Sequence, residues 1–187
     1  MYMEKSILLW LCVVLILTVG ISSCSGDGID WQLAGYQASY HADAYGIGYC
    51  LRNEDGDRST TFKEGENIIF DVTIFNATDY EISMGEEREI LWSAASVFRS
   101  DGEFVGNPMF KNSMTSEYRS FTIDAHGRHH WYCTWLGDYS PLNPLPKGTY
   151  YSMLKARVSY RIHDDSTPGG GTKGYDDVEM KIPFTVE

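Results

Sequence analysis

The 187-residue sequence predicts an all-β fold, a single antiparallel sandwich of about seven to nine strands. Three observations predict it. Hydrophobic residues alternate at every second position along several segments, turn residues separate these segments, and no stretch keeps the 3.6-residue period of a helix. Short alternating segments with regular turns are typical of two packed sheets, in which each strand buries one face.

The alternation is clearest in three segments, at residues 66–76, 149–163 and 177–187. Nearly every second residue in each is apolar, so we expect one face of each strand to be buried. Pro183 has no amide hydrogen to donate to a neighbouring strand, which predicts a free edge at that point. Further strands are expected at residues 45–52, 90–99, 118–124 and 128–136.

Residues that favour turns separate the expected strands. They stand at residues 53–56, 63–65, 100–102, 126–127, 147–148 and 168–171. The number of strands and the regular turns indicate a sandwich that is immunoglobulin-like in outline. The Cys–Trp–Cys spacing of antibody domains is not matched, so this is a statement about architecture.

The N-terminal residues have the features of a leader for export. Residues 7–21 are almost entirely apolar and follow Lys5. As a helix this run would reach about 22 Å, short of the roughly 30 Å hydrocarbon core of a membrane. It is followed by Ser22, Ser23 and Cys24, which resemble the lipobox of bacterial lipoproteins. The resemblance predicts that residues 1–23 are removed as a signal peptide and that Cys24 carries lipid, such as palmitate.

The same resemblance predicts a location in the cell envelope. Ser25 resembles an outer-membrane address, and Asp27 and Asp30 resemble the acidic export signals of surface lipoproteins. We therefore expect a protein anchored to the outer membrane and exposed at the cell surface. Residues 24–42 have no period and are expected to form the tether of a domain at 43–187. A retained membrane span and an ordinary secretory leader are the alternatives.

Composition excludes some partners. The formal net charge is −11, and removal of Glu4 and Lys5 with the leader leaves it unchanged. Nucleic-acid phosphates bind lysine and arginine, so an acidic chain of this kind is not expected to bind nucleic acid. The expected contact with the membrane is made by the lipid.

Two cysteines, Cys50 and Cys133, remain in the expected mature domain. An exported protein can form disulfides, and a bridge between these two would contribute roughly 4 kcal/mol in the chain-entropy model. Two separate buried thiols are the alternative. Nothing in the sequence marks either residue as an activated nucleophile.

A family resemblance rests on four segments that follow one another in order: TTFKEGENIIFDVTIFNATD, VFRSDGEFVGNP, FTIDAHGRHHWYCTW and PLPKGTYYSMLKARVSY. They resemble the sandwich domains of the intracellular proteinase inhibitor (BsuPI-like) family and of related lipoproteins of gut Gram-negative bacteria. The resemblance covers roughly residues 45–187 and implies the fold. Inhibition belongs to a cytoplasmic member of that family, so no residue here is assigned an inhibitory role.

The sequence predicts no catalytic residue, metal or cofactor. His129 and His130 are adjacent in an expected strand and would point to opposite faces, so they cannot readily share one ion with His126. Residues 53–58 contain three carboxylates but lack the spacing of a calcium loop. A pair of carboxylates for hydrolysis stays open, because sequence does not specify their separation.

Aromatic residues offer another candidate site. Trp131 and Trp135 are four residues apart and would face the same way on a strand. They could form an exposed platform for a sugar or protein partner, or fill the core beside Cys133. The leading hypothesis is a non-catalytic lipoprotein whose immunoglobulin-like module binds a protein or glycan partner. The alternatives are an envelope proteinase inhibitor and a small carboxylate-dependent hydrolase.

Overall fold

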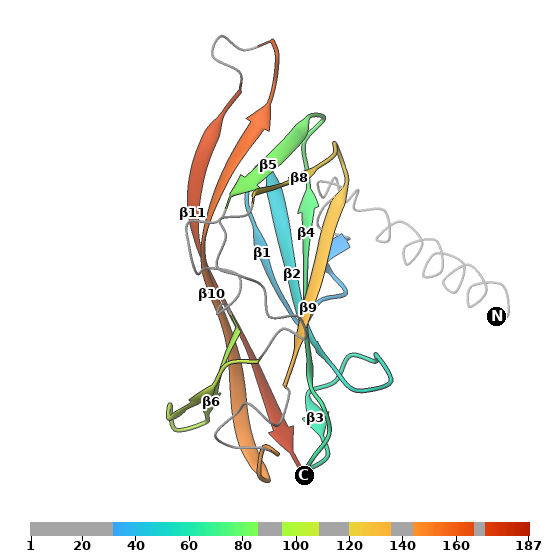
Figure 1. Ribbon diagram of the computed structural model, residues 1–187, viewed down its shortest axis with the longest axis vertical. Helices are drawn as coiled ribbons and strands as arrows, with labels where there is room; N and C mark the ends of the chain where they lie inside the picture. The colour runs from blue at the N-terminus through green and yellow to red at the C-terminus, as the bar shows by residue number, and fades with distance from the viewer. Residues whose placement is uncertain (1–31, 86–94, 109–119, 136–143, 167–170) are drawn as a thin grey trace, which may run out of the picture.

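A computed structural model describes residues 32–85, 95–108, 120–135, 144–166 and 171–187 (Figure 1). These residues form an all-β sandwich, which confirms the predicted fold class. The strands are β1 (Ala38–His41), β2 (Tyr45–Arg52), β3 (Thr61–Phe62), β4 (Ile69–Asn76), β5 (Glu81–Gly85), β6 (Ala95–Arg99), β7 (Phe104–Gly106), β8 (Ser120–Ile123), β9 (Arg128–Thr134), β10 (Gly148–His163) and β11 (Lys173–Val186). The expected leader at 1–23 and Cys24 lie outside the described residues.

The strands make two sheets. One sheet has the order β1–β2–β4–β9 and is antiparallel throughout. The other has seven strands in the order β3–β11–β10–β5–β8, with β6 paired to β10 and β7 paired to β6. The pairing of β3 with β11 is parallel, which departs from the antiparallel expectation. The eleven strands in the described residues exceed the predicted number because β1, β3 and β7 are short and carry little sequence signal.

The longest strand, β10, organises the seven-stranded sheet (Figure 1). One of its edges pairs with β11, and the other pairs with β6 along its first half and with β5 along its second. Beyond β10, β3 meets β11 only at Thr185 and Val186. Among the described residues, no strand pairs with the outer edge of β11 at Pro183, as the predicted free edge requires.

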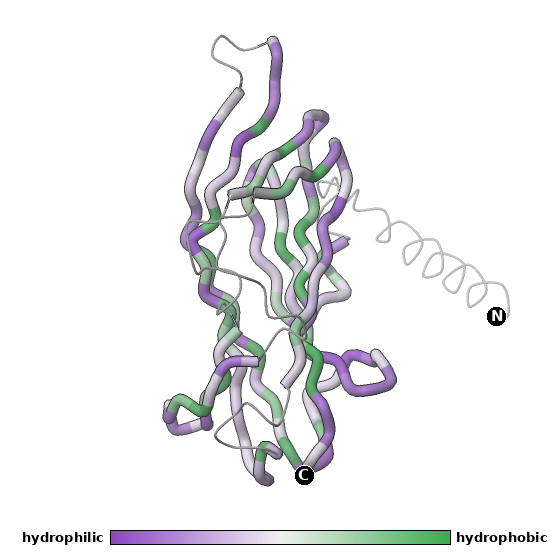
Figure 2. Tube along the Cα trace, in the orientation of Figure 1, coloured by the Kyte–Doolittle hydropathy of each residue, from purple (hydrophilic) through white to green (hydrophobic). Residues whose placement is uncertain are grey.

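The core lies between the two sheets. The apolar residues predicted to share a face of β4 and its approach are all buried: Ile68, Phe70, Val72 and Ile74. Polar atoms also link the sheets, since the hydroxyl groups of Tyr49 and Ser152 are 2.5 Å apart and Tyr45 donates a hydrogen bond of 2.8 Å to Asp176. Figure 2 shows the turn after β2 as a mainly hydrophilic stretch outside this core.

The expected tether at 24–42 is wrong at its C-terminal end. Residues 38–41 form β1, and residues 32–37 pack on the outer face of the four-stranded sheet. Leu33 is buried against Phe75, and the Gln37 side chain accepts a hydrogen bond from the Leu51 amide. The sequence did not reveal this packing because the contacts are made by isolated residues without a period.

Gly48 allows the close approach of this N-terminal segment. A Cβ atom at Gly48 would lie 2.5 to 2.6 Å from atoms of the Tyr36 ring, well inside contact distance. The ring also contacts Phe75 edge-on at 6.0 Å and lies under the Arg58 guanidinium at 4.8 Å. The ring is thus held from several sides.

We therefore expect Gly48→Ala to lower the free energy of unfolding by about 1–3 kcal/mol, because the ring must move. In a Tyr36→Ala background the same change should cost little, since a strand alanine loses less conformational entropy than glycine on folding. Urea denaturation of the four proteins of this cycle measures the coupling. An equal loss in both backgrounds would contradict the close approach.

Candidate functional site

The two cysteines lie on opposite faces of the four-stranded sheet. Cys50 pairs across the strands with Asp71, whereas Cys133 pairs with Phe70. Adjacent residues of β4 point to opposite faces, and β4 itself separates the two cysteine-bearing strands. The thiols are therefore free and buried, and of the two alternatives that the sequence left open the disulfide between them is wrong. The alternative of two separate thiols holds.

Burial also makes both thiols poor nucleophiles. It raises the pKa of Cys133 to about 12. Burial is the main cause of a raised pKa at Cys50 as well, and the Asp71 carboxylate adds to it. Reactive cysteines have a lowered pKa and some exposure, and these two have neither.

Alkylation with iodoacetamide at pH 8 should therefore leave Cys50 and Cys133 unmodified in the folded protein and modify both in urea. Peptide mapping by mass spectrometry without a reducing agent reads each position separately. Recovery of a peptide pair linked through these cysteines would contradict the arrangement of the strands.

The two tryptophans do not form an exposed platform. Trp131 pairs with Val72 and packs, partly buried, against the core. Trp135 is 4% exposed and donates its backbone amide to the Ile68 carbonyl at 2.8 Å. The expectation that they share a side is confirmed, but that side faces the core.

The histidines of the HGRHH segment are dispersed. Their partners are Asp79 for His126, the Phe121 ring for His129 and Asp71 for His130. Over the described part of the chain, no group of three or more histidine, cysteine, aspartate or glutamate side chains could hold a metal ion. The segment is part of the sandwich rather than a centre of chemistry.

Asp71 is the buried charge of the outer face of the four-stranded sheet. Its side chain is 4% exposed, forms an ion pair with the Arg52 guanidinium and is hydrogen-bonded to the His130 ring at 2.8 Å. A buried carboxylate is stable only when it is paired in this way. The arrangement satisfies a structural requirement and leaves no carboxylate poised for catalysis here.

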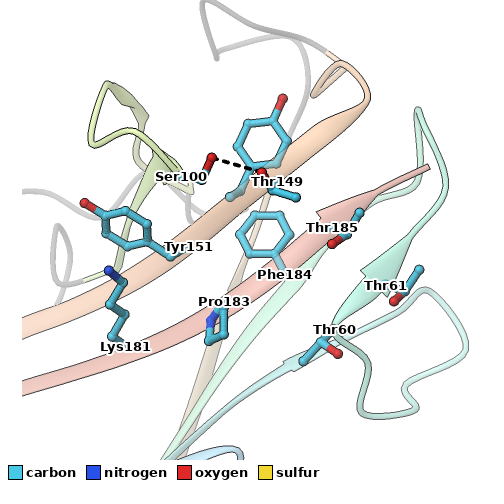
Figure 3. Close-up of a pocket in the computed structure, with 10 residues that line it drawn as sticks. Thr60, Thr61, Ser100, Thr149, Tyr151, Lys181, Pro183, Phe184 and Thr185 are labelled. Atoms are coloured by element: carbon cyan, nitrogen blue, oxygen red, sulfur yellow. Dashed lines mark hydrogen bonds between the residues drawn. The ribbon is translucent and has the colours of Figure 1, made fainter.

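A pocket of about 370 Å³ lies on the other sheet (Figure 3). It is lined by Thr60, Thr61, Ser100, Thr149, Tyr150, Tyr151, Lys181, Pro183, Phe184 and Thr185. The volume is within the range of roughly 300–1,000 Å³ for small-molecule sites. Five of the lining side chains carry an aliphatic hydroxyl, one carries a positive charge and none is a carboxylate.

The register of three strands assembles the pocket. Thr149 of β10 lies opposite Thr185 of β11, which in turn lies opposite Thr61 of β3. The turn after β6 adds Ser100, whose hydroxyl oxygen accepts a 2.9 Å hydrogen bond from the Thr149 hydroxyl. The hydroxyl groups thus come from segments more than 100 residues apart in the chain.

One edge of the pocket is an ordered stack of side chains. The Phe98 and Tyr151 rings are stacked, with centroids 5.0 Å apart and planes 11° apart. The Lys181 ammonium lies 3.5 Å from the centroid of the Tyr151 ring. Because β6 and β11 flank β10 on opposite sides, Phe98 and Lys181 occupy opposite faces of that ring. The lysine is therefore held in place by a cation–π contact.

Sequence reasoning missed this pocket. Thr149, Lys181 and Thr185 read alone as outward positions of alternating strands, and the sequence does not reveal which strands are neighbours. The detectable signal was the threonine content of the outward positions in and beside the predicted strands at 149–163 and 177–187.

Comparisons with known proteins leave the family open. No family model and no curated protein matches the chain, so the resemblance to the BsuPI-like family is not confirmed. Solved structures with distant likeness include the C-terminal domain of Wzt, at 9% identity and a TM-score of 0.40 over 80% of this chain and 77% of that one. A structural-genomics target, SoR45, has 9% identity and a TM-score of 0.38 over 79% and 90%.

A third structure is a candidate lipoprotein, YcdA, from Bacillus subtilis subsp. subtilis strain 168. It has 9% identity and a TM-score of 0.30 over 75% of this chain and 38% of that one. In the residues described above, no helix is both long and apolar enough to span a membrane.

Proposed function

We propose that this chain is a non-catalytic, lipid-anchored module of the cell envelope that binds a partner through the pocket of Figure 3. The observation that carries the proposal is the lining itself. It combines hydroxyl groups, aromatic rings and one positioned ammonium group, which are groups for recognition. It contains no carboxylate, histidine or thiol, so the carboxylate pair of a glycosidase and the histidine that activates a serine nucleophile are both missing from it.

The pocket lies on exposed residues, which a binding module needs. Thr60, Thr61, Thr149, Lys181 and Pro183 are all exposed. Beneath them Tyr150 and Phe184 are buried and stacked, with centroids 5.4 Å apart, so the floor is rigid. A rigid floor lowers the entropy lost on binding.

We expect Thr61→Trp, which places a large side chain at the pocket, to weaken partner binding at least tenfold. Thr172→Trp introduces a side chain of the same size at an exposed position just before β11, outside the pocket, and should leave binding unchanged. Binding of labelled protein to arrayed glycans and envelope proteins measures both variants beside the unmodified chain. Equal binding by all three would exclude the pocket as the site.

The anchor is tested separately. Cells supplied with an alkyne analogue of palmitate should label the unmodified protein but not Cys24→Ser, because the lipid is attached through that thiol. Fractionation should find the unmodified protein in the outer membrane, and protease treatment of intact and lysed cells should report which side it faces. Labelling of Cys24→Ser would overturn the assignment.

A further inference from the structure

The charge at the pocket is opposite in sign to the charge of the chain. Farther along the same face of β10 and β11, the cross-strand pairs are ion pairs, Lys155 with Glu179 at 3.3 Å and Arg157 with Asp177 at 2.9 Å. The next pair in this series joins Lys181 to Met153. Among the residues that the structure describes, Lys181 thus contacts an aromatic ring and no carboxylate.

We infer that the pocket binds an acidic saccharide whose carboxylate pairs with Lys181, an inference that rests on the proposed function. The ammonium group is already held over Tyr151, so little side-chain entropy is lost when an anion binds. Each threonine or serine hydroxyl can both donate and accept a hydrogen bond, as each sugar hydroxyl can. A sugar acid presents both kinds of group together.

The same face argues against an extended peptide as the occupant. An added strand would have to pair with the free edge of β11 beside the pocket. Pro183 stands on that edge and has no amide hydrogen to donate. Because backbone pairing is blocked at Pro183, we expect the ligand to be bound by the side chains of the pocket.

Calorimetry of the processed protein in detergent micelles tests the inference. The probes are uronic-acid oligosaccharides from pectin, alginate and hyaluronan, each beside its carboxyl-reduced, neutral form. We expect at least one acidic probe to bind at least tenfold more tightly than its neutral form, and less tightly at higher salt.

Matched variants identify the residue. Lys181→Gln should abolish the preference for the acidic probe, whereas Lys155→Gln, on the same exposed face, should retain it. Tyr151→Leu, which removes the ring under the ammonium, should weaken acidic binding, and Tyr151→Phe should retain it.

Two results would overturn the inference and leave the proposed function standing. One is equal binding of acidic and neutral probes that Thr61→Trp still abolishes. The other is binding of poly-glutamate, but of no saccharide, at the same pocket. If no probe binds and the arrays show no pocket-dependent partner, both proposals fail together.

Discussion

The seven-stranded sheet depends on the pairing of β10 along both of its edges. β11 covers one edge, while β6 and β5 divide the other, so a strand of 16 residues joins three strands that, among the described residues, do not pair with one another. The pocket is a product of this arrangement. Tyr151 stands on β10 with Phe98 from one neighbour on one face and Lys181 from the other neighbour on the opposite face.

The two outer faces of the sandwich differ in burial. On the four-stranded sheet Asp71 and Phe75 are buried, because residues 32–37 and the Arg52 side chain lie against that face. The ion pair with Arg52 and the hydrogen bond with His130 compensate the buried carboxylate there. On the seven-stranded sheet, Thr60, Thr61, Thr149, Lys181 and Pro183 of the pocket stay exposed. The face that residues 32–37 cover is thus opposite the face that bears the pocket.

Much of the fold could be predicted because burial imposes a two-residue period. The strand expected at 45–52 is observed as β2, and the predicted residues Phe70, Val72 and Ile74 form the core-facing side of β4, whose other side is also buried. Segments with few contacts were missed, such as β1 and the two-residue β3. The sequence could not exclude the disulfide, because the face of the sheet on which Cys50 lies depends on the register between β2 and β4.

The site was harder to predict than the fold. Thr61, Thr149 and Thr185 are separated widely in sequence and meet only through the pairing of three strands, one of them parallel. Pairing partners depend on the whole topology, which local periodicity does not encode. Trp131 and Trp135 stand out in the sequence, but large aromatic residues are typical of a binding site and of a core alike. The sequence alone could not decide between the two, and the structure places both against the core.

The packing of residues 32–37 shortens the tether that would join the domain to the membrane. If lipid is attached at Cys24, about eight residues separate it from the folded part, and such a segment reaches at most roughly 29 Å. That segment joins the face opposite the pocket. The domain would then stay in a thin layer above the bilayer, attached on the face away from the pocket. A ligand borne on a long polymer could reach the pocket from outside that layer without bending back to the membrane.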